Sequence, residues 1–588
     1  MKKRLVSIVL CVCVLMSMLS ACSSRNNQGA DTAAQVSGNE SGDDTSGSKK
    51  YEELITVDVF SHLANYQGIA TGWWADIVKE KFNMELNIIS PNVSGGGDTL
   101  YYTRTAGGDL GDLVIVGAEN GRMQELVTAG LIIDMADYVA DTEYLNQYTE
   151  AIENINTLVE EEGVYGIPLK VSSQSASTAS EGIEPTFGPY LRWDLYAELG
   201  YPEINSLSDL LDVLEDMQNL NPETETGNKA YALSLFKDWD GNMMICAKQP
   251  ACYYGYDEMG FVLARADGGD FQSIIEDDSM YVEVLEFFNE AYQRGLVDPE
   301  SSTQTFDVLE QKYRDGEVLF SFWPWMGQSY YNTTERMEEG KGFMIADITD
   351  MQIFSYGCNP LGDKTFIGVG SQAEDPERLM DFIEWMYSPE GVTLLSASQC
   401  GPKGLTWEMV DGEPVITEFG VLALINDSAD MPEGWGDGNY RDGMSQLNIT
   451  TVMETDINPD TGYPYYYLLW DSYQETYMTT ALHQDWQEHM GAMTAMDYLK
   501  ENDKLLTAPG SGYITPDQSA EIETIRGQVK SNIVSYSWQM VYANDDSEFS
   551  TLLSEMQTTV LGLGYEDVLT WDMQCAQDQE TARAAVRE

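Results

Sequence analysis

The chain has 588 residues, and 97 Asp and Glu against 31 Lys and Arg give a formal net charge of −66 at pH 7. Such a charge repels nucleic acids and anionic lipid surfaces, and it disfavours polyanionic ligands such as uronate polymers. Residues 51–588 exceed what one hydrophobic core normally supports, so at least two lobes are expected.

The chain begins with the pattern of a secretory signal peptide. Residues 2–4 are basic, and the apolar stretch 5–19 is shorter than the ~20 residues that a membrane-spanning helix needs. Residues 1–21 are therefore the predicted signal peptide, which indicates an extracytoplasmic protein.

The motif Leu19-Ser20-Ala21-Cys22 closes this stretch. It resembles the bacterial lipobox, in which the Cys thiol receives a diacylglycerol and becomes the new N-terminus. The resemblance implies that Cys22 is the lipidation site and that a lipid anchors the protein to the cell membrane. A free Cys in an ordinary signal peptide is the alternative. Residues 22–50 are rich in Ser, Gly, Asn and Asp, and we expect them to form a flexible tether.

Strand and helix patterns alternate in the next part of the chain. Apolar residues alternate from Ile55 to Val59, as in a strand, and 72–84 has the spacing of a helix. Strands are predicted at 85–90 and 112–117, and a helix at 123–135. This order is typical of a parallel sheet built from βα units.

Helices dominate from residue 190 onwards. The stretch 206–220 has Ser206 or Ser208 as its N-cap, and a second helix ends at Gly295. A strand is predicted at 365–370, followed by a helix with Asp375 as its cap. The order of strand-rich and helix-rich parts predicts a chain that crosses between two lobes more than once, with a cleft between them.

Four stretches resemble, in order, the extracellular solute-binding proteins of bacterial ABC sugar importers, a family that includes maltose-binding protein. They are 107–135, 163–171, 287–326 and 366–395. The long tail looks closer to the large lipoprotein subgroup found with oligosaccharide importers.

The resemblance implies a two-lobed α/β fold of the type II periplasmic-binding-protein kind, which closes on a sugar like a hinge. We assign residues 51–168 and 343–400 to lobe 1, and residues 169–342 and 401–588 to lobe 2. The implied function is that of a receptor without enzymatic activity, which passes an oligosaccharide to an ABC transporter permease.

Sugar binding requires aromatic plates for the CH face, with carboxylates and amides for the hydroxyls. Trp325 aligns with the family's sugar-stacking Pro-Trp tryptophan, and Trp323 lies two residues before it. Asp238, Trp239 and Asp240 fall where the family's second lobe supplies an acid and an aromatic ring. Core packing for the two tryptophans, and a surface turn for 238–240, are the alternatives.

Three further candidates follow predicted strands, because open α/β sheets bind ligands at the carboxyl ends of their strands. Glu119 and Asn120 come after the strand at 112–117, and Tyr66 comes after the first strand. The resemblance places hydroxyl-binding groups after the strand at 112–117, where Glu119 and Asn120 lie.

One stretch resembles the calcium loop of some oligosaccharide-binding relatives. Asn221, Glu223 and Glu225 hold its first three ligand positions, but Thr226 replaces the glycine at position 6 and the Glu at position 12 is missing. Calcium and a plain solvated turn both remain open, and no other cofactor is implied.

Two other functions compete with the receptor: a secreted, lipid-anchored glycoside hydrolase and an adhesion lipoprotein. The three histidines form neither a HExxH motif nor a recognisable triad, and no GxSxG motif is present. Only a pair of carboxylates could support hydrolysis, and with 97 acidic residues such a pair needs no special explanation.

Overall fold

The computed structural model describes residues 50–94, 98–119, 121–396, 399–425 and 429–587. The predicted signal peptide, Cys22 and the tether as far as residue 49 lie outside the described residues, as does Asn120. Contacts divide the chain into two units, Met1–Lys50 and Tyr51–Glu588, and every element below belongs to the second.

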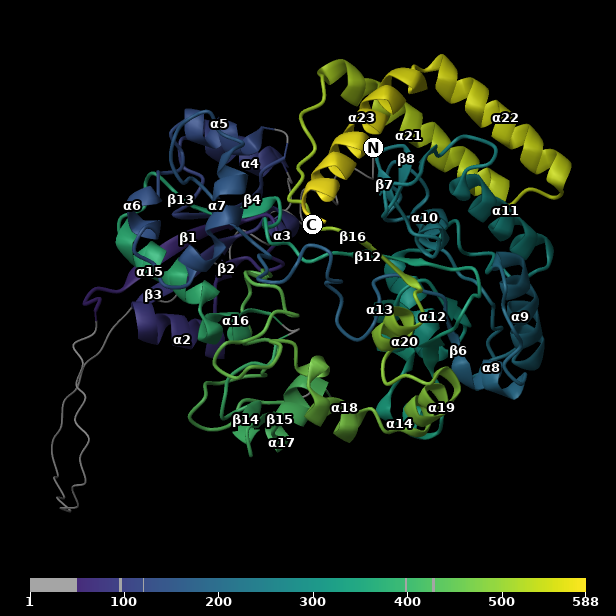
Figure 1. The fold of residues 1–588 in the computed structure, drawn as a ribbon, viewed down its shortest axis with the longest axis horizontal. Helices are drawn as coiled ribbons and strands as arrows, with labels where there is room; N and C mark the ends of the chain where they lie inside the picture. The colour runs from purple at the N-terminus through teal and green to yellow at the C-terminus, as the bar shows by residue number, and fades with distance from the viewer. Residues whose placement is uncertain (1–49, 95–97, 120, 397–398, 426–428, 588) are drawn as a thin grey trace, which may run out of the picture. The chain divides into compact units, whose positions relative to one another are not determined.

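A six-stranded sheet organises the first part of this unit (Figure 1). Its spatial order is β2 (Gly68–Ile69), β3 (Met84–Ile89), β1 (Ile55–Ser61), β4 (Leu113–Gly117), β13 (Thr365–Val369), β5 (Ile167–Pro168). The strands β3, β1 and β4 are parallel, whereas β2, β13 and β5 each run antiparallel to a neighbour. The predicted parallel βα sheet is therefore present, with antiparallel strands added at both edges.

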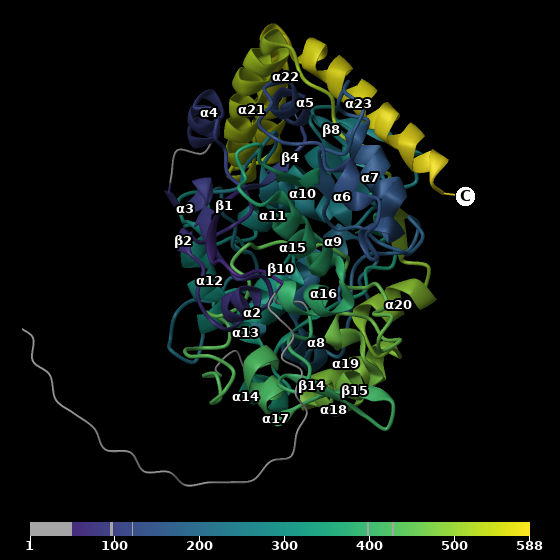
Figure 2. The same cartoon turned by 90° about the vertical axis from the view of Figure 1, so that its left-hand side faces the viewer.

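Side chains on alternate sides of these strands enter two clusters, which we together call the sheet core. Val57, Val59 and Ile115 face one cluster, while Phe60 and Val116 face the other. This is the alternation that the pleat of a strand imposes. The first cluster includes residues of helices α2 (Trp73–Phe82) and α15 (Pro376–Tyr387), and the second includes residues of α4 (Asp98–Ala106) and α5 (Arg122–Thr128) (Figure 2).

The helices of this part are mostly short. They are α2 (Trp73–Phe82), α3 (Pro91–Ser94), α4 (Asp98–Ala106), α5 (Arg122–Thr128), α6 (Ala136–Val139), η1 (Leu145–Tyr148), α7 (Thr149–Asn156), α15 (Pro376–Tyr387) and α16 (Pro389–Leu395).

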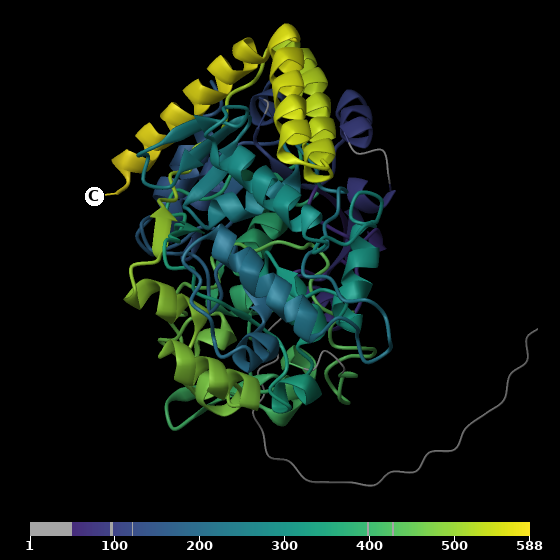
Figure 3. The same cartoon turned by 90° about the vertical axis from the view of Figure 1, so that its right-hand side faces the viewer.

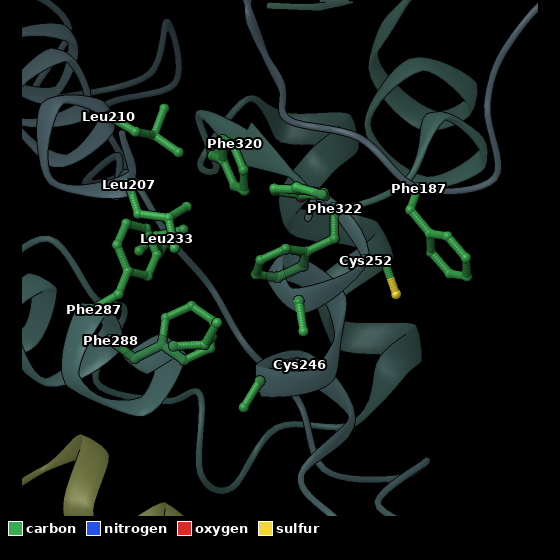
Figure 4. Close-up of a cluster of buried hydrophobic side chains, with 14 of the residues drawn as sticks. Phe187, Leu207, Leu210, Leu233, Cys246, Cys252, Phe287, Phe288, Phe320 and Phe322 are labelled. Atoms are coloured by element: carbon green, nitrogen blue, oxygen red, sulfur yellow. The ribbon is translucent and has the colours of Figure 1, made fainter. Parts of the chain in front are cut away.

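A second and larger cluster of buried side chains, the helical core, is built mainly from helices. In Figure 4, Leu207 and Leu210 of α9, Phe287 and Phe288 of α11, and Phe320 of β10 belong to one such group. The helices of this part are α8 (Trp193–Glu198), α9 (Leu207–Leu220), α10 (Ile245–Cys252), α11 (Met280–Gln293), α12 (Phe306–Asp315), α13 (Pro324–Tyr331), α14 (Thr334–Glu338), α19 (Ala481–Met490), α20 (Ala495–Glu501), α21 (Ala520–Val541), α22 (Asp546–Gly562) and α23 (Tyr565–Ala585).

Three small sheets accompany these helices. Their strands are β10 (Phe320–Ser321), β6 (Tyr190–Arg192) and β11 (Phe343–Ile345); β7 (Tyr256–Met259), β8 (Val262–Arg265) and β9 (Phe271–Ser273); and the parallel pair β12 (Ile353–Tyr356) and β16 (Leu505–Ala508).

The segment after α16 forms a small cluster of its own around Trp407, Tyr467 and Trp470. Its elements are β14 (Trp407–Val410), β15 (Glu413–Ile416), α17 (Glu418–Gly420), η2 (Val421–Ile425), η3 (Tyr467–Leu469) and α18 (Asp471–Tyr477).

The chain passes repeatedly between the two large cores. It leaves the sheet core after Val171, returns to it at Phe366, and leaves it again after Tyr465. The predicted repeated crossing is therefore present.

The packing of two segments does not follow the predicted lobes, in which 343–400 belongs to lobe 1 and 401–588 to lobe 2. Side chains between Phe343 and Phe354 pack in the helical core, because β11 pairs with β6 and β12 pairs with β16. Buried side chains between Ala423 and Tyr465 pack in the sheet core instead. The division of the chain into lobes stays a prediction, but these two segments pack opposite to their assignment.

Several predicted helix ends are confirmed. The Ser206 side chain accepts a hydrogen bond from the backbone N–H of Asp209, and Asp375 accepts one from Arg378 ahead of Pro376. Gly295 has a φ of 76°, which suits a glycine just after a helix. Among the described residues, no helix combines the length and apolar character that crossing a bilayer requires.

The last three helices are joined to the rest by a buried ion pair. Helices α21 and α22 lie side by side, the yellow pair at the top of Figure 3, and α23 follows them. On α23, Asp572 is only 3% exposed, and its carboxylate accepts hydrogen bonds from Arg526 Nη1 (2.9 Å) and Nη2 (2.5 Å) of α21. The same carboxylate accepts the backbone N–H of Phe261 at 2.7 Å, so one side chain joins α21, α23 and the turn before β8.

We expect Asp572→Ala to lower the free energy of unfolding by about 3 kcal/mol, because it leaves the Arg526 guanidinium buried without its partner. Urea unfolding followed by circular dichroism measures this. The matched control is Asp578→Ala, which removes an exposed carboxylate from the same helix and should change stability by less than about 0.5 kcal/mol. Equal losses in the two variants would contradict the role of Asp572.

Candidate functional site

The structure brings together the three tryptophans that the sequence singled out. The ring centroids of Trp239 and Trp325 are 5.8 Å apart, and those of Trp323 and Trp325 are 5.1 Å apart. Trp323 is 4% exposed and belongs to the helical core, whereas Trp239 is 45% exposed and Trp325 is 39% exposed. Two indole rings are therefore available to a ligand, and the third supports them from below.

The chain before α13 holds Trp325 in place. Ser321 ends β10, and its hydroxyl accepts the backbone N–H groups of Trp323 (3.3 Å) and Gly327 (3.1 Å). Pro324 then starts α13, a position where its missing N–H has no cost. These hydrogen bonds hold the backbone before and after Trp325, which projects from the first turn of α13.

The two acids beside Trp239 are occupied by structural contacts. Asp238 accepts the backbone N–H of Phe306 at 2.8 Å, at the start of α12. Asp240 accepts the backbone N–H of Ile245 at 2.9 Å and the indole N–H of Trp538 at 2.7 Å, and burial raises its pKa. These hydrogen bonds fix the loop that carries Trp239, so both acids position its indole ring by holding the loop in place.

Trp325 also lines a cavity of about 730 Å³, which we call the Trp325 cavity. Its other walls combine aromatic rings, carboxylates and amides. They include Tyr466, Tyr473, Tyr477, Glu181, Glu184, Glu454, Gln328, Asn332 and His483. The described lining residues include no Lys or Arg. Hydrogen-bond acceptors without competing cations, next to aromatic faces, suit a neutral ligand rich in hydroxyl groups.

Burial governs the charge of the groups in this cavity. Glu184 accepts hydrogen bonds from Tyr190 (2.8 Å) and Gln328 (3.1 Å), and burial raises its pKa to about 7. Burial also raises the pKa of Glu181 and of Glu454. The ring of His483 lies 2.8 Å from the Thr480 hydroxyl, and burial lowers its pKa to about 4, so it is neutral at pH 7.

Glu119 lines a different cavity of about 590 Å³, the Glu119 cavity, which shares no described lining residue with the Trp325 cavity. Its carboxylate pairs with Lys364 at 2.5 Å. Tyr66 is half-buried, its hydroxyl donates to the carbonyl of Ile69 at 2.8 Å, and it is absent from the described linings of both cavities. The structure therefore does not bring these two candidates together with the tryptophans.

The calcium candidates form an exposed turn. Asn221 is the C-cap of α9, and the turn closes through the backbone N–H of Gly227 donating to Thr224 at 2.9 Å. The carboxylate of Glu225 points to Lys341 at 3.4 Å. Within the described residues, no three His, Cys, Asp or Glu side chains gather closely enough to hold a metal ion.

Sequence reasoning missed most of the Trp325 cavity. Gln328 lies three residues after Trp325, so helical spacing could have placed the two side chains on one face. Tyr466 belongs to a tyrosine run that the sequence makes visible. Glu181 and Glu184 carry no local signal that separates them from the other acidic residues.

Comparison with solved structures supports the architecture. An alginate-binding protein, AlgQ2, crystallised without calcium ion, has a TM-score of 0.57 at 15% identity, covering 90% of this chain and 99% of its own. An HMO binding, ABC-transporter associated solute-binding protein from Bifidobacterium longum infantis has a TM-score of 0.57 at 12% identity, covering 89% and 98%. The substrate-binding protein FusA of S. pneumoniae, in complex with kestose, has a TM-score of 0.57 at 14% identity, covering 90% and 100%. These likenesses confirm the predicted two-lobed, periplasmic-binding-protein-like α/β fold.

No curated protein matches the chain. A family model described as bacterial extracellular solute-binding protein matches residues 73–402, which is more than half of the chain. The predicted family is confirmed, and with it an extracytoplasmic location. The chain belongs to the bacterial extracellular solute-binding proteins.

Proposed function

We propose that this protein is a lipid-anchored receptor that captures a neutral oligosaccharide outside the cell and delivers it to an ABC transporter permease. The observation that carries the proposal is the Trp325 cavity, where aromatic rings stand beside carboxylates and amides and no Lys or Arg is among the described lining residues. Family membership supports solute binding, and the similar structures named above are described as binding alginate, HMO and kestose.

The exposed indole rings of Trp239 and Trp325 provide the surface on which we expect the sugar to stack. Trp239 and Trp325 expose neighbouring rings, and an apolar CH face of a sugar stacks on such a surface. Glu181, Glu184 and Gln328 then supply acceptors and a donor for the ring hydroxyls. The net charge of −66 supports an uncharged sugar over an acidic one, even though one similar structure is an alginate-binding protein.

We also propose that the two cores correspond to two lobes that move about the crossing segments. The buried residues support boundaries near 172–178, 357–365 and 466–481. A ligand held between such lobes stabilises one hinge state over the other, and a permease can recognise that state.

A hydrolase is the competing function, because Glu181 and Glu184 form a pair of carboxylates in one cavity. Both already accept several hydrogen bonds from the protein, and the family consists of binding proteins. We therefore propose that the bound sugar leaves unchanged.

The test is a glycan-array screen of the purified 51–588 unit, followed by calorimetry on the glycans that bind. Saturable binding with recovery of intact glycan supports the receptor. Release of shorter sugars during incubation would establish hydrolysis instead.

We expect Trp325→Ala to weaken binding of the selected glycan at least tenfold, about 1.4 kcal/mol, because the stacking surface is lost. Isothermal titration calorimetry measures the affinity. Trp435→Ala is the matched control, since Trp435 is 38% exposed and absent from the described lining of the Trp325 cavity. Unchanged affinity in Trp325→Ala would remove this ring from the binding site.

The raised pKa of Glu184 gives a pH signature. Its pKa is about 7 in the folded chain against an ordinary value of 4.5, so between these pH values the folded chain binds more protons than the unfolded chain. The free energy of unfolding therefore falls as the pH rises through this window, and the effect is complete above about pH 7.

We expect Glu184→Gln to remove this decline, which amounts to about 3 kcal/mol, because the amide does not ionise. Urea unfolding of both proteins at several pH values measures the difference. Parallel pH profiles for the two proteins would show that Glu184 ionises as an ordinary surface carboxyl.

Anchoring is tested in cells. We expect Cys22→Ser to abolish incorporation of labelled fatty acid and to release the protein from the membrane fraction, because Ser offers no thiol for the diacylglycerol. Cys358→Ser, which changes a buried internal cysteine, is the control and should stay in the membrane fraction. Fatty-acid label retained by Cys22→Ser would contradict the anchor.

A further inference from the structure

The Glu119 cavity contains a buried cation that has no hydrogen-bond or ion-pair partner among the described residues. Arg583, on the last turn of α23, is 8% exposed and lines this cavity. Two other arginines are buried to a similar degree, and both have partners: Arg192 pairs with Asp194 at 2.6 Å, and Arg378 with Asp375 at 2.9 Å. Within the described part of the chain, the Arg583 guanidinium makes neither a hydrogen bond nor an ion pair.

The two acids that act electrostatically on Arg583, Asp257 and Glu580, are already engaged by other residues. Asp257 pairs with the buried Lys248 and accepts the hydroxyl of Tyr356 at 2.8 Å. Glu580 accepts both terminal nitrogens of Arg587, at 2.5 Å and 3.2 Å. Burial lowers the pKa of Arg583, and the charges of Asp257 and Glu580 offset this effect only in part.

A buried charge without a partner is costly, and an anion that enters the cavity would relieve that cost. The guanidinium offers a planar fork of donors that matches a carboxylate in two parallel hydrogen bonds. The cavity is also lined by the acids Glu119, Asp257, Glu258 and Asp363 and by the bases Lys170 and Lys364. Acids outnumber bases even with Arg583 included, so a multiply charged phosphate or sulfate would meet more repulsion than a single carboxylate.

We propose that the Glu119 cavity is a second ligand site, in which Arg583 binds the carboxylate of a small monocarboxylic acid. The volume of about 590 Å³ leaves room for more than the carboxylate itself. The site is separate from the Trp325 cavity, so its occupant is a ligand other than the proposed sugar.

The walls of this site come from both cores of the fold. Arg583 and Asp257 belong to elements packed on the helical core, whereas Lys364 directly precedes β13 of the sheet. A carboxylate bound between them contacts segments on both sides of the crossings. It therefore prefers one arrangement of the cores, and by linkage its binding changes the affinity for the sugar.

The test uses the purified protein and sodium acetate as the probe, followed by saturation-transfer difference NMR. We expect saturation transfer to the acetate methyl group in the native chain and its loss in Arg583→Gln. Arg587→Gln is the matched control, because it removes a guanidinium four residues further on that is paired with Glu580 and absent from the cavity lining. Acetate signals of equal size in native chain and Arg583→Gln, or no transfer in either, would overturn the proposal.

Thermal unfolding provides a second readout that does not depend on a probe signal. At equal ionic strength, acetate in place of chloride should raise the midpoint of the native chain by about 1 °C and leave that of Arg583→Gln unchanged. In chloride, Arg583→Gln should be at least as stable as the native chain, because an unpaired buried charge is removed. If Arg583→Gln does not fold, Arg583→Lys replaces it in the same measurements. Weaker acetate binding to this variant than to the native chain supports two-point binding by the guanidinium. Undiminished acetate binding refutes it.

Competition between acetate and inorganic phosphate tests which class of anion the site prefers. Inorganic phosphate at the same concentration should displace acetate poorly, because the acidic residues of the wall repel a second negative charge. Complete displacement by phosphate at lower concentration than acetate would refute a site for monocarboxylates.

Discussion

The antiparallel pairing of β13 with both β4 and β5 is the constraint on which the rest of the architecture depends. Ile367 pairs with Ile115 on one side and with Ile167 on the other, so the chain leaves the sheet after Pro168 and re-enters it at Thr365 along the same edge. The parallel strands β1 and β4 also end at this edge. Crossing segments and strand-end loops are thereby gathered in one place, and this is where a ligand can touch both cores.

Local signals in the sequence predicted local structure well. Alternating apolar residues indicated β1, and the caps at Ser206 and Asp375 marked helix starts, because each signal depends on residues within a few positions of one another. The segments 343–354 and 423–465 pack in a different core from the one that their predicted lobe suggests, while the lobe division itself stays a prediction. Their partners, such as β6 for β11, lie more than a hundred residues away, and no local pattern encodes that pairing.

The candidate binding surface shows the same limit of local sequence signals. Trp325 and Trp239 were identified from a family-like motif, and the structure brings them together from segments more than eighty residues apart. Glu184 could not be identified, since its distinction is its desolvation beside Tyr190 and Gln328 rather than any feature of its neighbours in the chain. In a chain with 97 acidic residues, burial is what distinguishes a candidate site carboxylate from the exposed ones.

The interleaving of the two cores has a consequence for biosynthesis. Side chains of Val529, Ile533 and Val560 complete an interior that begins at Ala179, so that interior stays open until almost the entire polypeptide has been made. Contacts over such long separations form slowly. This delay is compatible with an export route that transports the chain unfolded. A product that lacks the last few helices would instead expose apolar surface and be cleaved by proteases.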